Sequence, residues 1–129
     1  GLKTAVKLTI DKIDQINKLQ QNDLCASFQQ AIIDILLKKT EIGIYYTNKK
    51  NFKINNLVVA GGVAANKAIR KSLRNLCIKN RFNIFFPPIN LCGDNAAMIA
   101  WACLQRYKNG YKSDINFKPR PRWSLNELN

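Results

Sequence analysis

The chain has 129 residues, 47% of them hydrophobic, which excludes a disordered protein and allows one domain with a hydrophobic core. Its 21 Lys and Arg outnumber 8 Asp and Glu and give a net charge of +13, which favours anionic partners such as nucleic acid, nucleotides or a membrane surface. A coding bias toward Lys, Asn and Ile would explain the same excess without any partner. No apolar run approaches the roughly 20 residues that a membrane span needs, so we expect no transmembrane helix. Of the anionic partners we expect nucleic acid and a nucleotide, and no membrane.

Two helices are predicted in the first part of the chain. Residues 4–19 place apolar side chains at three- and four-residue steps, and a stronger helix follows, with Asn22 or Asp23 as its N-cap. Polar residues and a glycine predict a break between Thr40 and Asn51. The buried face of the stronger helix is expected to hold Leu24, Phe28, Ala31, Ile32, Ile35 and Leu36.

Two short strands are predicted next, at residues 57–60 and 83–86. Both are continuous apolar runs, the pattern of strands that are covered on both faces. The order of elements predicts a helix-rich α/β fold with a few short parallel strands.

Two more helices complete the predicted fold. One runs from Val63 or Ala64 to about Lys79, and the other begins near Gly93 and ends at Gly110 in a left-handed cap. The inward residues of the first are expected to be Ile69, Leu73, Leu76 and Cys77. The tail, about residues 115–129, is basic and extended.

The four cysteines are predicted to be reduced thiols. None forms a CxxC pair, the sequence shows no signal peptide, and the chain has no histidine, so a zinc site built by this chain is not expected. Each cysteine has apolar neighbours, which favours burial. These features indicate a cytoplasmic protein, or an organellar one if the parent organism is eukaryotic.

The junction after the first strand, at Gly61 and Gly62, is a candidate ligand site. Ligands of open α/β sheets gather at the carboxyl ends of strands, and glycines there let backbone N–H groups approach a phosphate. The amide of Asn66 would project near such a ligand. The alternative is a tight turn with Asn66 on the surface, because the pattern is neither a GxGxxG nor a Walker loop.

Asp94 is a second candidate, at the start of the last predicted helix. Its carboxylate could face the same cleft as Asn66 and there bind a metal or steady a charged substrate, or it could simply cap the helix.

Basic side chains supply a third candidate. They form a stripe that could contact a phosphate backbone or could be an ordinary solvated helix face: Lys67, Arg70, Lys71 and Arg74. The tail adds residues typical of RNA contact: Lys118, Arg120, Arg122 and Trp123. The alternative for Trp123 is that it packs the tail onto the core.

Three segments in this order resemble the C-terminal part of a known enzyme family. They are LVVAGGVAANKAIRKSL, FFPPINLCGDNAAMIAWA and PRPRWSL, and the opening GLKTAV also matches. The family is the tRNA-adenosine threonylcarbamoyltransferases (TsaD), formerly named O-sialoglycoprotein endopeptidases or glycoproteases. The resemblance implies the second lobe of an actin/sugar kinase/Hsp70-like ATPase fold, so we expect residues 1–129 to be one domain of a larger two-lobed enzyme.

The resemblance also implies a reaction and a site. The reaction transfers the threonylcarbamoyl group from its adenylate to the exocyclic amine of the tRNA adenosine beside the anticodon. Asn66 would contact the adenylate, Gly61 and Gly62 would lie near its phosphate, and Asp94 would bind iron or zinc, one divalent metal per full-length subunit. The partners would include tRNA and the paralogous and ATPase proteins of the modification complex.

Two departures from the family pattern limit what this chain can do alone. The family's other metal ligands are a histidine pair upstream, whereas this chain has no histidine, and Gly93 stands where the family usually has Thr. The chain alone is therefore expected to be inactive and to bind metal weakly or not at all. The alternatives are a non-catalytic nucleotide- or partner-binding lobe of the same superfamily and a metalloprotease, although the sequence has no HExxH motif.

Overall fold

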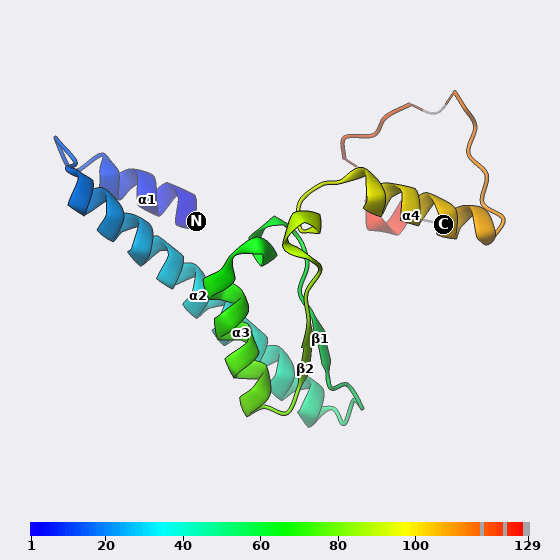
Figure 1. Cartoon of the computed structure of the whole chain (residues 1–129), viewed down its shortest axis with the longest axis horizontal. Coiled ribbons are helices and arrows are strands. Elements are labelled where there is room, and N and C mark those ends of the chain that lie inside the picture. The colour runs from blue at the N-terminus through cyan, green and yellow to red at the C-terminus, as the bar shows by residue number, and fades with distance from the viewer. Residues whose placement is uncertain (117, 123, 128–129) are drawn as a thin grey trace. The chain divides into compact units, whose positions relative to one another are not determined.

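Helices and short strands alternate along the chain in a computed structural model, which describes residues 1–116, 118–122 and 124–127. The described residues form four α-helices and one parallel sheet of two strands (Figure 1). In chain order they are α1 (Leu2–Ile10), α2 (Lys18–Lys49), β1 (Asn56–Val58), α3 (Lys67–Lys79), β2 (Asn83–Phe85) and α4 (Ala96–Lys108). The prediction of a helix-rich α/β fold with short parallel strands is confirmed.

The chain divides into two compact units, Gly1–Gly93 and Asp94–Asn129, and each is described by itself. The first unit contains the sheet with α1, α2 and α3, and the second contains α4 and the basic tail. In the tail, Arg120 and Glu127 form an exposed ion pair of 3.0 Å. Trp123, a predicted RNA-contacting residue, lies outside the described residues. The expectation that the whole chain is one domain stays a prediction.

Helix α2 starts earlier than the sequence pattern predicts. Asn17 caps it, because its side chain accepts a hydrogen bond from the Gln20 amide while the Gln20 side chain accepts one from the Asn17 amide. The prediction of Asn22 or Asp23 as the cap is therefore wrong, as is that of one helix over residues 4–19, since α1 already ends at Ile10. The predicted break before Asn51 is confirmed by the end of α2 at Lys49.

The hydrophobic core of the first unit lies where α2 and α3 pack against one face of the sheet. Ile33 of α2 and Ile69 and Leu73 of α3 are its buried centre. Ile84 of β2 packs against them, as do Val59 and Phe86, the residues that directly follow β1 and β2. Cys77, also on α3, is fully buried. The inward face predicted for α3 is thus confirmed for Ile69, Leu73 and Cys77, whereas Leu76 is only half-buried. On α2, however, Ile35 is 45% exposed and Ile33 takes the buried position.

The other face of the sheet is not covered within the described residues. Side chains of successive strand residues point to opposite faces, so Val58 and Phe85 point away from the helices and are 71% and 54% exposed. The prediction that both strands are covered on both faces is wrong for this chain, because α2 and α3 both lie on the same face.

The four cysteines divide equally between surface and interior. All are free thiols, and Cys77 and Cys92 are buried as predicted, whereas Cys25 and Cys103 are exposed. Burial raises the pKa of the Cys77 thiol, which makes that side chain a weak nucleophile. Among the described residues, no helix combines the length and the apolar character that crossing a bilayer requires.

Candidate functional site

The candidate site in the first unit lies at the carboxyl ends of the two strands. Strands β1 and β2 run parallel, with Leu57 opposite Ile84 and Val58 opposite Phe85. Each strand leads into a short 3-10 turn, Gly62–Ala65 after β1 and Ile89–Leu91 after β2. The two turns lie against each other at the same edge of the sheet (Figure 1). Parallel α/β sheets bind their ligands at this edge.

The two glycines of the first turn differ in what they require from the backbone. Gly61 has φ 91° and ψ 169°, a conformation that is essentially restricted to glycine. Gly62 does not have a positive φ, and a Cβ atom added to it would meet nothing within 4 Å. The geometry of the chain therefore explains a glycine at position 61 but leaves the one at position 62 without a conformational reason.

Asn66 is the N-cap of α3. Its Oδ1 accepts hydrogen bonds from the amides of Ala68 at 2.9 Å and Ile69 at 3.1 Å, and its Nδ2 donates to Oε1 of Gln29 at 2.8 Å. The prediction that α3 begins at Val63 or Ala64 is therefore wrong, because the 3-10 turn comes first. The contact with Gln29 of α2 was not predicted, since no local pattern links residues that are 37 positions apart.

Arg70 is buried, which contradicts its prediction as a member of an exposed basic stripe. It is only 9% exposed, and its guanidinium donates hydrogen bonds to the carbonyl oxygens of Ala64 and Pro87 and to Sγ of Cys92. It also lies over the Phe86 ring, 4.8 Å from the centroid. The helix periodicity could have indicated this burial, because Arg70 is three residues before the buried Leu73 and so lies on the same side of the helix.

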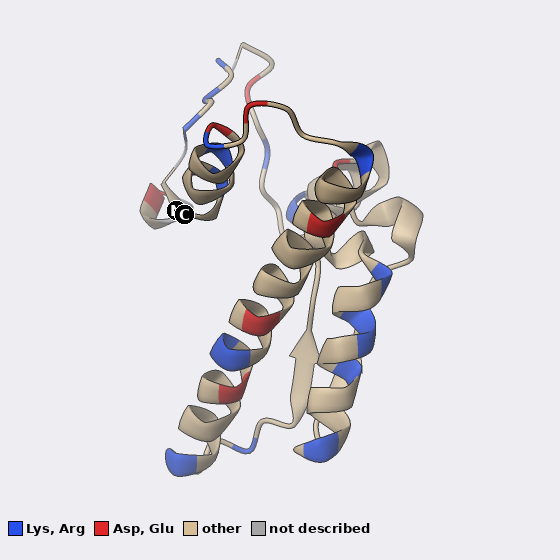
Figure 2. Cartoon of the chain, turned by 90° about the vertical axis from the view of Figure 1, so that its left-hand side faces the viewer, with Lys and Arg blue, Asp and Glu red and all other residues tan. Residues whose placement is uncertain are grey.

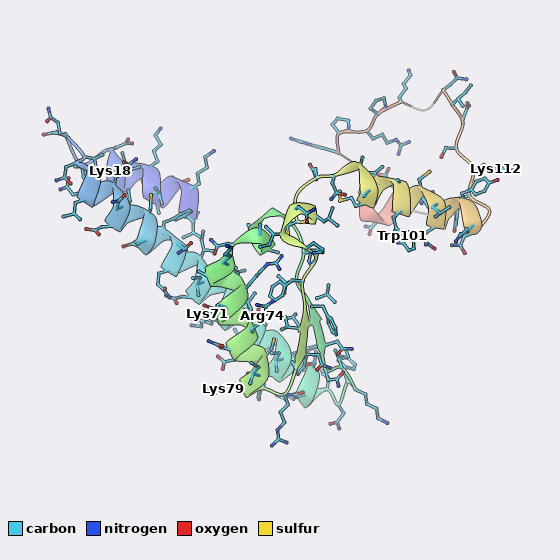
Figure 3. The ribbon with its side chains drawn as sticks, viewed as in Figure 1. Lys18, Lys71, Arg74, Lys79, Trp101 and Lys112 are labelled. Atoms are coloured by element: carbon cyan, nitrogen blue, oxygen red, sulfur yellow. The ribbon has the colours of Figure 1, made fainter. Side chains whose placement is uncertain are left out.

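The other three members of the predicted stripe are exposed and lie along α3: Lys67, Lys71 and Arg74. Figure 2 shows blue residues following one side of this helix, and Figure 3 shows the side chains of Lys71 and Arg74 with that of Lys79 further along. The helix contains no acidic residue. It therefore presents a positive surface, although Arg74 also reaches the Phe86 ring at 5.3 Å.

Asp94 is exposed and belongs to the second unit, just before α4. The cap of α4 is the next residue, because Oδ1 of Asn95 accepts a hydrogen bond from the Met98 amide at 2.9 Å. The alternative reading of Asp94 as the helix cap is therefore wrong. Asp94 instead lines a hollow of about 520 Å³ together with Asn95, Ala96, Met98 and Ile99. The expectation that Asp94 and Asn66 face one cleft stays a prediction.

The C-terminal end of α4 lies where the sequence predicts it. Its C-cap is Asn109, and Gly110 follows with φ 82°, as the predicted left-handed cap requires. The amide of Gly110 donates to the carbonyl of Tyr107 at 3.0 Å, which closes the last turn.

The described residues do not form a complete metal site. Nowhere in the part of the chain that the structure describes do three His, Cys, Asp or Glu side chains gather closely enough to hold an ion. A single carboxylate such as that of Asp94 is a minority of any coordination shell. Within the described residues, Asp94 has no set of neighbouring ligands that would complete such a shell.

A family model describes the sequence over most of its length. Residues 1–101 match the family of tRNA N6-adenosine threonylcarbamoyltransferase, TsaD. The chain belongs to the TsaD family. The matched region includes the glycine turn, Asn66, Arg70 and Asp94. Of the segments on which the sequence resemblance rests, PRPRWSL at residues 119–125 lies beyond it.

Individual relatives agree with this assignment. The tRNA N6-adenosine threonylcarbamoyltransferases of Chelativorans sp. (strain BNC1), Rickettsia rickettsii (strain Sheila Smith) and Methylocapsa acidiphila are 47%, 45% and 42% identical to the chain. These alignments cover 97–99% of the chain but only 36–38% of each relative. The chain thus spans little more than a third of the proteins it matches.

Proposed function

We propose that this chain supplies the carboxyl-terminal part of a tRNA-adenosine threonylcarbamoyltransferase and contributes one wall of its adenylate site. The main support for this proposal is the match of residues 1–101 to the family. The matched residues include a glycine turn at the carboxyl edge of a parallel sheet. Threonylcarbamoyl-adenylate would be the donor, and the exocyclic amine of a tRNA adenosine next to the anticodon would attack it. The fold would be one lobe of the actin/sugar kinase/Hsp70 type.

In this proposal the glycine turn receives the phosphate of the adenylate. Gly61 supports the turn because it adopts a conformation that other residues avoid, and Gly62 keeps the surface beside it free of a side chain. Backbone amides in such turns attract anions. The packing of the chain gives no reason for a glycine at position 62. A close approach of the ligand would supply that reason, because a Cβ atom there would be in its way.

Asn66 would orient the adenylate from the start of α3. Its Oδ1 is engaged by two backbone amides, so the amide nitrogen is the part of the side chain suited to a ligand oxygen. The hydrogen bond to Gln29 holds that nitrogen toward α2. Because the donor is already an activated mixed anhydride, the role of these residues is to position it for attack.

The exposed basic residues of α3 would contact the tRNA backbone. Lys67, Lys71 and Arg74 carry positive charge on a helix without acidic residues, and the chain as a whole has a net charge of +13. Arg70, although basic, is excluded from this surface by its burial. Binding through such contacts should weaken steeply as salt is added.

Other features of the family enter the proposal together with residues or proteins outside this chain. Asp94 would contribute one ligand to an iron or zinc ion, and the remaining ligands would have to come from other residues of the full-length protein. The paralogous and ATPase proteins of the modification complex would be its partners. The cytoplasm, or an organelle, would be its place of action.

Depletion of the full-length protein tests the proposed reaction. Threonylcarbamoyladenosine in bulk tRNA, measured by mass spectrometry of nucleosides, should fall after depletion and recover when the intact gene is restored. Unchanged modification would favour the alternative, a lobe of the same superfamily that binds a nucleotide or partner without transfer. The protease reading is not favoured, because the chain has no histidine and the described residues no metal cluster.

A further inference from the structure

Arg70 is a buried cation whose described partners include no carboxylate. The only ion pair among the described residues joins Arg120 and Glu127, so the charge of Arg70 is balanced by carbonyl dipoles, a thiol and an aromatic ring. Burial of a charge in such surroundings is unfavourable unless its hydrogen bonds are well made. An apolar side chain would fill the same space without the cost of burying a charge. The presence of Arg at this position therefore needs another explanation.

The hydrogen bonds of Arg70 join the two turns of the candidate site. Its Nε donates to the Ala64 carbonyl, in the turn that follows β1. Its Nη2 donates to the Pro87 carbonyl at 2.7 Å and to Cys92 Sγ at 3.0 Å, in the segment that follows β2. The guanidinium also lies over the Phe86 ring, 4.8 Å from its centroid, which adds a third contact from the segment around the end of β2.

We propose that Arg70 is a positioning residue: it clamps the glycine turn to the Pro87–Cys92 segment and so sets the shape of the carboxyl edge on which the adenylate would lie. Only a planar fork with several fixed donors can reach both turns at once, and a lysine ammonium cannot reproduce this arrangement. The structural part of the inference stands on its own contacts, whereas its consequence for catalysis rests on the proposed function.

Two buried thiols allow the clamp to be tested without any assay of activity. Cys92 accepts a hydrogen bond from Arg70 and is 5% exposed, whereas Cys77 is fully buried on the core side of α3. Opening of the clamp should expose Cys92 alone, and global unfolding should expose both. The exposed Cys25 and Cys103 report whether the thiol reagent is active in each sample.

The experiment measures alkylation of each cysteine by mass spectrometry in the parent chain, Arg70→Met and Arg70→Lys. We expect Cys92 to react at least about tenfold faster in both variants, because hydrogen bonds to a charged group typically shift a local equilibrium by that much. Cys77 should keep its parental rate. Arg74→Gln is the matched control, since Arg74 shares the Phe86 ring but lies on the exposed side, and it should leave Cys92 protected.

Two outcomes would overturn the structural part. Parental protection of Cys92 in a folded Arg70→Met variant would mean that packing, and not the clamp, closes the segment. If Arg70→Met exposes Cys77 as well, the milder Arg70→Lys variant decides the matter. Exposure of Cys77 there too would make Arg70 a general stability residue and reject a local positioning role.

A transfer assay with the full-length protein and its partner proteins tests the catalytic consequence. Arg70→Lys should lower kcat/KM for the adenylate by about 10- to 100-fold while tRNA affinity stays within about twofold, because supporting residues typically act on this scale. A parent protein without transferase activity would refute the proposed function but leave the labelling result intact. An active parent matched by an equally active Arg70→Lys would refute the positioning role alone.

Discussion

Replacement of Asn66 can separate a role as helix cap from a role in binding the adenylate. The side chain uses Oδ1 for the amides of Ala68 and Ile69, and Nδ2 for Gln29. Asn66→Asp keeps an acceptor for both amides and can accept a hydrogen bond from Gln29. Its negative charge is favourable at a helix N-terminus but repels a phosphate. Asn66→Ala removes the cap and the ligand contact together.

The two variants should therefore differ in stability in a predictable way. Loss of an N-cap typically costs about 0.5–2 kcal/mol, and the exposed hydrogen bond to Gln29 adds about 0.5 kcal/mol. For Asn66→Ala the total is about 1–2.5 kcal/mol, which lowers the melting temperature of a unit of this size by about 4–20 °C. Asn66→Asp should melt within about 3 °C of the parent.

Binding is measured by calorimetry on the full-length protein with AMP and with a non-hydrolysable analogue of threonylcarbamoyl-adenylate. Both variants should bind the analogue at least about tenfold more weakly, since one hydrogen bond to a charged or polarised group has about this value. Parental affinity in the stable Asn66→Asp variant would show that Asn66 is a helix cap only. Weak binding in Asn66→Ala alone would be ascribed to the lost cap.

Three further predictions follow from the same geometry. Gly61→Ala should lower the melting temperature of the chain, because φ 91° and ψ 169° strain any residue with a Cβ; unchanged melting would contradict the turn conformation. Neutralisation of each exposed basic residue of α3, by Lys67→Gln, Lys71→Gln or Arg74→Gln, should reduce the slope of log affinity for tRNA against log salt by about 1. The matched double variant Lys38→Gln, Lys39→Gln on α2 should leave this slope unchanged. Equal effects of the α3 and α2 variants would mean that the attraction is non-specific. Titration of this chain with zinc or ferrous iron should show no micromolar site, because the described residues hold no cluster of metal ligands; a tight site abolished by Asp94→Asn would contradict this prediction.

Local patterns predicted the parts of the fold that local contacts determine. The four-residue spacing of Ile69, Leu73 and Cys77 matches their burial, because one face of a helix packs on the sheet. The start of α2 was also present in the sequence, since Asn17 and Gln20 stand at capping-box spacing. It was missed because Asn22 and Asp23 are equally good cap residues.

Long-range contacts explain most of the errors. The side chain of Arg70 points inward because it donates hydrogen bonds to a carbonyl and a thiol that lie 17 and 22 residues further along the chain. Its charge alone predicts an exposed side chain. The exposed Val58 was predicted to be buried because a short apolar run does not reveal how many layers cover its sheet. The relation of Asp94 to Asn66 likewise depends on tertiary structure that no spacing of residues determines.

Gly62→Ala tests the central claim, that the glycine turn holds the adenylate, most directly. A Cβ at this position meets nothing within 4 Å and needs no positive φ, so the variant should fold and melt like the parent. If the phosphate approaches the turn closely, the added methyl group should weaken binding of the adenylate analogue to the full-length protein at least about tenfold. Unchanged affinity in this stable variant would contradict the proposed site.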